Sequence, residues 1–307
     1  MGVRSVSADT ISVVRPLQQT SAAFADKTLF WASSDHLGAS QVRVPHECLA
    51  PCLSVEYVSE QEQLVGVFGD GTILGAPLDI QGQLSSVHVI GEVAGSELLV
   101  VSWSPDRDLC ALLGDGPSLL MLSAEEWMME AQAPKLQSGK PVSACWRGDG
   151  QMIAVRTLGD ESPLVIFSRD AEMLAKASIE AEEVLGRCIA WKPSGELIAA
   201  VNTHAKKVVF FEPNGLRHGD FPLNRDFEVN VDVGLSWNAD SDILAVWNKT
   251  LVHLYVRENY RWYLKQSLNL PGEEQGNTFV GLGFSCNFSC QLCLEFGKGS
   301  SGLSCWR

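Results

Sequence analysis

Three cysteines near the C-terminal end of the sequence have a spacing that suggests chemistry. Cys286, Cys290 and Cys293 follow a C-x3-C-x2-C pattern, which holds an iron–sulfur cluster in radical S-adenosylmethionine enzymes. That fold needs its barrel downstream of the motif, and only 14 residues follow Cys293. The cysteines also lie in a strand-like pattern, where neighbouring side chains point to opposite faces. We therefore interpret the spacing as coincidental and expect no metal there.

No other motif predicts a catalytic or cofactor-binding residue. Residues 297–302 read G-x-G-x-x-G, but a dinucleotide site needs a following helix and a second parallel strand. The histidines show no pair at metal-ligand spacing and no adjacent nucleophile motif, so we expect surface or turn positions for them. They are His36, His46, His88, His204, His218 and His253.

One segment combines aromatic and basic residues. Residues 259–266 read NYRWYLKQ, a composition that could form a surface on which nucleic-acid bases stack. In a strand, however, Tyr260 and Trp262 would share one face and Tyr263 would take the other. An outer strand packed against a neighbouring sheet explains this pattern better, and we favour that interpretation.

The elements that must position these residues follow from a repeat. Tryptophans separated by 43, 45 and 46 residues each close a short apolar run, and an alanine stands eight residues after each of them. A turn rich in Pro, Gly, Asp, Asn or Ser and a second apolar run follow each tryptophan. We expect these residues to be structural anchors of the repeat: Trp103, Trp146, Trp191, Trp237, Ala111, Ala154, Ala199 and Ala245.

Each repeat unit contains four predicted strands. In one unit they span 142–146, 152–158, 164–169 and 173–179, and in the next Pro213-Asn214-Gly215 predicts a hairpin turn between the last two. Four-stranded units of 40 to 50 residues are typical of propeller blades. The sequence thus predicts an all-β, WD40-like β-propeller, and the small alanine suits a crowded inner strand. Trp-Asp and Gly-His dipeptides are absent, so packing must hold the blades together.

Weaker units flank the four strong ones. Tyr57 stands one repeat before Trp103, and Phe284 stands one repeat after Trp237, but neither is followed by the alanine. With these two, the sequence contains about six units, and we expect an incomplete ring. We expect residues 1–296 to form one propeller domain, with its first, degenerate unit within 1–95, and residues 297–307 to be a flexible tail.

Composition narrows the function classes. The net charge of −14 disfavours a general phosphate-binding surface, and neither a signal-peptide pattern nor a membrane-spanning apolar run is present. Cys110, Cys145 and Cys188 fall in apolar stretches, as reduced, buried thiols of a cytosolic protein do. The acidic stretch around Glu180 and Glu183 is interpreted as a solvated turn.

Five blade sequences carry a family resemblance. In order they read WRGDGQMIAV, IAWKPSGELIAA, VVFFEPNGLRHGDFPL, LSWNADSDILAVW and NYRWYLKQSL. They resemble the first propeller of the largest subunit of the Elongator complex, continuously from Trp146 to Leu268 and more weakly at VVSWSPDRDLCALL. After Phe296 the sequence stops matching, so it resembles a truncated form.

The resemblance implies a non-catalytic scaffold. Its complex modifies wobble uridines of transfer RNA with carboxymethyl-type groups at carbon 5, in the cytoplasm and also in the nucleus. The implied partners are other Elongator subunits. Transfer RNA would be engaged only through the complex, no membrane is involved, and the family's dimerisation region is absent here. The alternatives are a generic propeller adaptor unrelated to Elongator, a propeller enzyme with channel-facing catalytic groups, and a truncated product without function.

Overall fold

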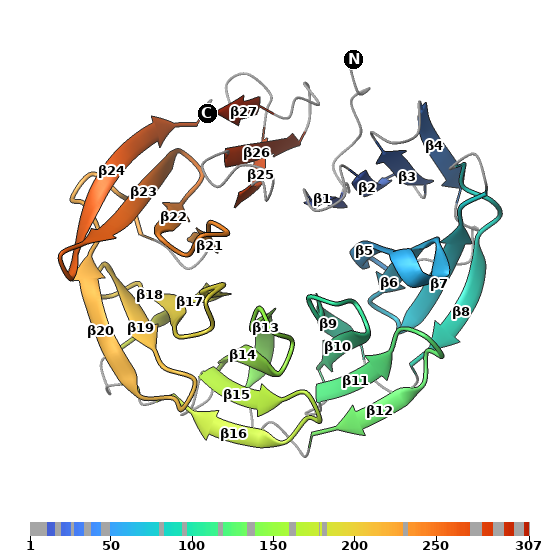
Figure 1. Ribbon diagram of the computed structural model, residues 1–307, viewed down its shortest axis with the longest axis horizontal. Helices are drawn as coiled ribbons and strands as arrows, with labels where there is room; N and C mark the ends of the chain where they lie inside the picture. Colours follow the sequence, from blue (N-terminus) through green and yellow to red (C-terminus); the bar gives the residue numbers. More distant parts are fainter. Residues whose placement is uncertain are drawn as a thin grey trace.

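The computed structural model consists of antiparallel sheets arranged around a ring (Figure 1). It describes most of residues 50–270, together with the strands at either end, within 11–43 and 278–306. The gaps between 50 and 270 are 80–82, 94–96, 116–118, 134–138, 160–163, 178, 180–182 and 230–232. The part of the chain that is described includes no helix long and apolar enough to cross a membrane.

The described strands form seven sheets that follow one another along the chain, and we number these sheets blades 1 to 7. Blade 1 contains β1 (Ile11–Arg15), β2 (Thr20–Ala25), β3 (Thr28–Ser33) and β4 (Gly38–Arg43). Blade 2 contains β5 (Cys52–Val58), β6 (Gln63–Phe68), β7 (Thr72–Pro77) and β8 (His88–Glu92), with a short 3-10 turn at Ser59–Gln61. Blade 3 contains β9 (Leu98–Trp103), β10 (Leu109–Gly114), β11 (Leu119–Ser123) and β12 (Met129–Gln132).

The remaining blades repeat this order. Blade 4 contains β13 (Lys140–Trp146), β14 (Met152–Leu158), β15 (Leu164–Ser168) and β16 (Met173–Lys176). Blade 5 contains β17 (Leu185–Trp191), β18 (Ile198–Asn202), β19 (Lys207–Phe211) and β20 (Arg217–Pro222). Blade 6 contains β21 (Gly234–Trp237), β22 (Ile243–Trp247), β23 (Leu251–Glu258) and β24 (Arg261–Asn269), and blade 7 contains β25 (Thr278–Phe284), β26 (Leu292–Gly297) and β27 (Ser304–Trp306).

Within each blade the strands are hydrogen-bonded in chain order. The first strand lies toward the centre of the ring and the last on the outside (Figure 1). The all-β propeller prediction is confirmed, and the strands predicted for residues 142–179 match β13 to β16 within three residues at each end. The predicted hairpin turn is present as well, because Gly215 donates its N–H to the carbonyl of Glu212 at 2.9 Å.

The structure has one more blade than the repeat of about six predicted. The extra sheet is blade 1, where no aromatic residue continues the tryptophan spacing. Among the strands that the structure describes, no hydrogen-bonded ladder joins blade 7 to blade 1. Of the expected tail, Gly297 ends β26 and Ser304–Trp306 pairs with β26 as β27, and the rest lies outside the described residues.

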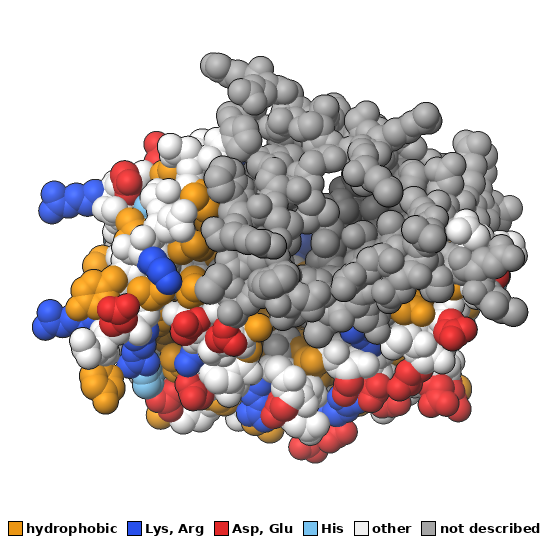
Figure 2. Space-filling view, turned by 45° about the horizontal axis from the view of Figure 1, so that its top comes forward, with side chains coloured by type: hydrophobic (Ala, Val, Ile, Leu, Met, Phe, Trp, Pro, Cys, Tyr) orange, Lys and Arg blue, Asp and Glu red, His pale blue; other side chains and the backbone are white. Residues whose placement is uncertain are grey.

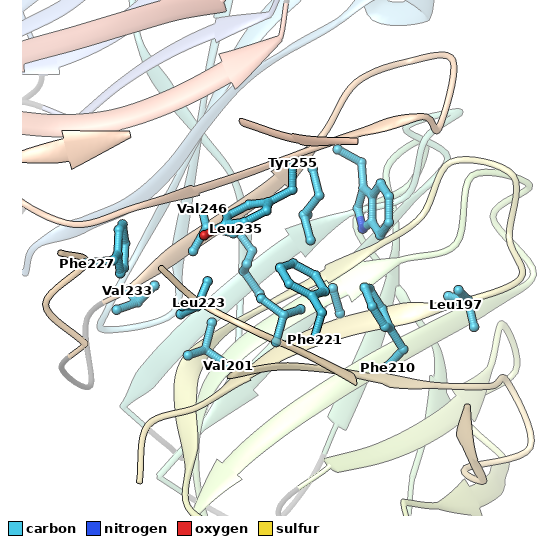
Figure 3. Close-up of a cluster of buried hydrophobic side chains, with 14 residues drawn as sticks. Leu197, Val201, Phe210, Phe221, Leu223, Phe227, Val233, Leu235, Val246 and Tyr255 are labelled. Atoms are coloured by element: carbon cyan, nitrogen blue, oxygen red, sulfur yellow. The ribbon is translucent and has the colours of Figure 1, made fainter. Parts of the chain in front are cut away.

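Buried apolar clusters lie between successive blades. The largest joins blades 5 and 6 (Figure 3) and contains Phe210, Phe221 and Tyr255. The ring centroids of Phe221 and Tyr255 are 4.8 Å apart. Both faces of a blade that lies between two others are therefore covered. This explains why the second strands β10 and β18, and the first half of β14, read as apolar runs rather than as alternating patterns.

Candidate interaction surfaces

The four repeat tryptophans close the innermost strands of blades 3 to 6. Each side chain is buried and belongs to an apolar cluster. Trp103 ends β9, Trp146 ends β13, Trp191 ends β17 and Trp237 ends β21.

Three of these tryptophans are hydrogen-bonded to the preceding blade. Their indole N–H groups donate to its innermost strand: Trp103 to Ser54 Oγ at 3.1 Å, Trp146 to the carbonyl of Ser102 at 3.0 Å, and Trp237 to that of Ala190 at 3.3 Å. Trp191 differs, because it donates to the carbonyl of Gly195 in its own blade at 3.1 Å. A buried indole N–H needs such a partner, so a polar contact accompanies the apolar packing at three blade boundaries.

We had expected the repeat alanines on the innermost strand, but they lie on the second strand of blades 3 to 6. They are fully buried on β10, β14, β18 and β22. Three of them share an apolar cluster with the tryptophan of the next blade: Ala111 with Trp146, Ala154 with Trp191, and Ala199 with Trp237. Their small size thus allows the following blade to approach, although farther from the axis. In blade 2 Val65 takes the same position beside Trp103.

Charged side chains connect neighbouring blades at the turns that follow the tryptophans. Arg107 lies 3.4 Å from the buried carboxylate of Glu56 in the preceding blade. Arg169 of blade 4 lies 3.0 Å from Asp106 and 3.3 Å from Asp108 of blade 3. Partial burial alone would raise the pKa of Asp106, but hydrogen bonds from Ser104, the Asp108 backbone and Arg169 hold it below its ordinary value. These turns are therefore joined to the neighbouring blade by charged contacts.

A buried arginine connects blades 4 and 5 more strongly. Arg156 on β14 donates from Nε to the carbonyl of Gly186 at 2.9 Å and from Nη2 to that of Leu185 at 2.6 Å, both on β17. It also donates to the carbonyl of Thr157. Burial lowers the pKa of Arg156 to about 10, so the guanidinium stays charged at neutral pH.

The acidic stretch before blade 5 is not a solvated turn throughout. The side chain of Glu183 is only 4% exposed and accepts hydrogen bonds from Arg217 at 2.5 Å and Asn202 at 3.2 Å. Arg217 also pairs with Asp220 at 2.6 Å. Sequence reasoning missed this contact because Arg217 lies 34 residues away along the chain.

Of the histidines that the structure describes, one departs from the expected surface position, whereas His36 and His46 lie outside the described residues. His253 on β23 is completely buried and packs against the ring of Phe227, with its Nδ1 3.3 Å from the Tyr255 hydroxyl. Its Nε2 lies 4.0 Å from a carboxylate oxygen of Asp226 and has no hydrogen-bond partner within the described part of the chain. Burial lowers the pKa of His253, and Asp226 opposes this effect.

The aromatic and basic segment around β24 divides between core and surface. Trp262 packs against Phe210 and Phe221, at centroid distances of 5.2 and 5.0 Å, which confirms its expected role in blade packing. Tyr260, however, lies in the turn before β24 and is 90% exposed, and Tyr263 is 46% exposed. The expectation that Tyr260 shares the buried face of Trp262 is therefore wrong.

Exposed apolar side chains gather on the outer strands of blades 3 and 4. Met128 precedes β12 and Met129 begins it, while Met173 and Leu174 lie on β16. All four are between 46% and 63% exposed. Because exposed large apolar side chains can mark an interaction site, we consider these two outer strands a candidate docking surface.

Among the described residues, Cys110, Cys145 and Cys188 form no disulfide. Cys110 is buried, whereas Cys145 and Cys188 are half-buried, and burial raises the pKa of all three. Within the described ranges, no three His, Cys, Asp or Glu side chains are grouped to hold a metal ion. Cys286, Cys290 and the side chain of Cys293 lie outside the described residues, so their coincidental spacing stays a prediction.

Comparison with known proteins decides the family. The sequence matches the family model described as the ELP1 first N-terminal beta-propeller over residues 6–140 and 128–285. This chain belongs to that family. The resemblance to the largest Elongator subunit is thereby confirmed, and the matched residues extend well before Trp146.

Similarity to curated Elongator proteins supports the same family assignment. Elongator complex protein 1 of Mus musculus is 30% identical over 283 residues, covering 73% of this chain and 21% of the relative. The protein of that name from Schizosaccharomyces pombe is 39% identical over 133 residues, covering 41% of this chain and 10% of the relative. The chain thus spans about a fifth or less of the length of these relatives.

Two solved structures share the fold of this ELP1-family propeller. Chaetomium thermophilum Raptor superposes with a TM-score of 0.67 at 13% identity, over 96% of this chain and 27% of that one. A KlHsv2 variant with loop 6CD replaced by a Gly-Ser linker gives a TM-score of 0.61 at 13% identity, over 85% of both chains. At such low identity these likenesses establish the propeller architecture alone.

Proposed function

We propose that this chain is a non-catalytic scaffold of the Elongator complex. In this role it docks other Elongator subunits and contributes indirectly to the carboxymethyl-type modification of wobble uridines in transfer RNA, in the cytoplasm and also in the nucleus. The family match over residues 6–285 carries the proposal. The contacts between blades support it, because a docking platform must hold its surfaces in fixed relative positions.

The inner strands support a non-catalytic role. The half-exposed positions of β9 and β13 are apolar or small, as in Val100, Val101, Ser102 and Ala144. General acid–base and nucleophilic chemistry require titratable groups within hydrogen-bonding reach of each other. The described parts of these two strands bring no such pair together.

The apolar outer strands of blades 3 and 4 are the surface we assign to subunit docking. Met129 and Met173 are exposed on β12 and β16. Methionine side chains adapt their shape to a partner surface, and burying them gives a free-energy gain roughly proportional to the apolar area removed from water.

Affinity capture of the tagged chain from cells, with the captured proteins quantified by mass spectrometry, tests the proposal. We expect the Elongator subunits to be enriched severalfold over a tag-only control. The double variant Met129→Ser/Met173→Ser should capture less of them, whereas Leu216→Ser, which changes an exposed apolar side chain of blade 5, should not. Capture of no Elongator subunit by the folded chain would contradict the scaffold role.

A further inference from the structure

The hairpin formed by β23 and β24 is longer than the outer part of other blades. Its strands have eight and nine residues, whereas the outer strands β12 and β16 have four each. Figure 1 shows this hairpin on the outer edge of the ring, at the left of the view. A blade is complete without the residues by which β23 and β24 exceed the outer strands of other blades.

The turn of this hairpin holds a strained and exposed tyrosine. Asn259 and Tyr260 have φ angles of 47° and 63°, as a two-residue type I′ turn requires. Asparagine tolerates this conformation and glycine is favoured at the second position, whereas a bulky residue there costs about 1 kcal/mol or more. Tyr260 is 90% exposed, so core packing does not offset this cost. Its described contact is the Arg257 guanidinium, 5.9 Å from the ring centroid.

The two faces of β24 differ in chemistry. Trp262 and Leu264 pack against the cluster between blades 5 and 6. Arg261 and Tyr263 alternate with them on the opposite face and are exposed. Lys265 is exposed as well and lies at a β-bulge, where the pairing with β23 shifts by one residue. Residues two positions apart in a strand are separated by roughly 7 Å, so this face places the Arg261 cation beside the Tyr263 ring, and the Lys265 cation follows at the bulge.

The hairpin is basic on an acidic protein. Residues 257–265 contain three cations and one carboxylate, Glu258, while the whole chain carries a net charge of −14. Figure 2 shows Lys or Arg and hydrophobic side chains side by side at the left edge of the molecule, where the hairpin lies in Figure 1. Polyanions repelled elsewhere on the surface would be attracted to this edge.

We propose that the β23–β24 hairpin binds single-stranded RNA. In this arrangement Arg257, Arg261 and Lys265 contact phosphates, and the rings of Tyr260 and Tyr263 stack on bases. Aromatic side chains interleaved with cations are how proteins hold single strands without sequence preference. An acidic peptide would satisfy the cations but offers no bases for the two exposed tyrosines, so RNA fits both features of the surface.

This inference goes beyond the proposed scaffold role, because it assigns direct RNA contact to the chain itself. Its test uses the purified chain of 307 residues without other subunits, so either proposal can fail alone. The probe is a fluorescein-labelled oligouridine of 12 nucleotides, and the readout is fluorescence anisotropy at several salt concentrations, with unlabelled poly-glutamate as competitor.

Three variants and one control separate the contribution of the hairpin cations to binding from that of the tyrosines. Arg261→Ala/Lys265→Ala should weaken binding about tenfold at low salt and reduce the slope of log Kd against log salt concentration by about 1.4, because each phosphate contact on a single strand contributes about 0.7. Tyr263→Ala should weaken binding about fivefold with the slope unchanged. Arg225→Ala/Lys249→Ala, which removes one exposed cation from the loop before blade 6 and another from the turn between β22 and β23, should affect affinity less than twofold.

Tyr260→Gly gives the sharpest distinction between RNA binding and a structural role. It should weaken binding about fivefold while the melting temperature stays equal or rises, because glycine relieves the strained turn. The proposal is overturned if the folded wild-type chain does not bind the oligouridine at low salt, or if the control weakens binding as much as the hairpin variants. Poly-glutamate competing as well as RNA, with the tyrosine variants unchanged, would also overturn it and indicate an acidic protein partner.

Discussion

The indole N–H of Trp146 donates to the carbonyl oxygen of Ser102 at 3.0 Å, across the boundary between blades 4 and 3. Trp103 and Trp237 make equivalent contacts with the blades before them. Because apolar packing is not directional, these hydrogen bonds add contacts of defined geometry within the buried clusters between the blades.

Trp146→Phe removes the N–H but keeps an aromatic ring. We expect the free energy of unfolding to fall by about 1 to 2 kcal/mol, since the carbonyl of the half-buried Ser102 loses its indole donor. Urea unfolding followed by circular dichroism measures this change. Trp127→Phe, at a half-buried position on blade 3, is the matched control and should cost less, and an equal cost for both would show that the interblade bond contributes nothing specific.

Arg156→Met should destabilise the chain by about 2 to 3 kcal/mol. The thioether fills part of the same space, but the carbonyls of Leu185 and Gly186 lose their charged donor. Arg147→Met breaks an exposed pair with Asp149 and should cost less than about 1 kcal/mol. Thermal melts of both variants provide the comparison, and a reversed order would refute the role given to Arg156.

Ala154→Leu should overpack the boundary between blades 4 and 5. Ala154 is fully buried in one cluster with Trp191, and additional methylenes in such a site cost about 1 to 3 kcal/mol. Ala205→Leu, at an exposed turn position, controls for the change in residue type. An unchanged melting temperature for Ala154→Leu would mean that the blades are not in close contact at this position.

Stability should fall as the pH is lowered from 7.5 to 5.5, partly because of His253. Burial lowers its folded-state pKa below the ordinary value of about 6.5, so the unfolded chain binds the proton at a higher pH. The destabilisation therefore begins as the pH falls through the ordinary histidine range and is complete below the folded-state pKa. The urea concentration at the unfolding midpoint should change less with pH for His253→Phe than for wild type. The exposed control His88→Gln should show the same change with pH as wild type.

The strands of the central blades could be predicted because their signals are local. In blade 4 the apolar runs and the turn after Trp146 gave strand limits close to those of β13 to β16. Blade 1 was not predicted as a separate unit, because it lacks both the tryptophan and alanine of blades 3 to 6 and the aromatic residue that marks blades 2 and 7.

The polar contacts could not be predicted because they join residues distant in the sequence. Glu183 meets Arg217, and Arg169 of blade 4 meets Asp106 of blade 3. Strand alternation also places Tyr260 on the face of Trp262, but the left-handed backbone of the turn takes it out of the strand. The exposure of this tyrosine, and with it the candidate RNA surface, depends on a turn conformation that residue spacing does not reveal.

Our main proposal is that this ELP1-family propeller is a scaffold of the Elongator complex. Its most direct test is the amount of carboxymethyl-type wobble uridine in total transfer RNA, quantified by nucleoside mass spectrometry after disruption of the gene for this chain and after its re-expression. The account predicts that the modified nucleosides fall severalfold on disruption and recover on re-expression. Modification that stays at the wild-type level in the disrupted cells would contradict it.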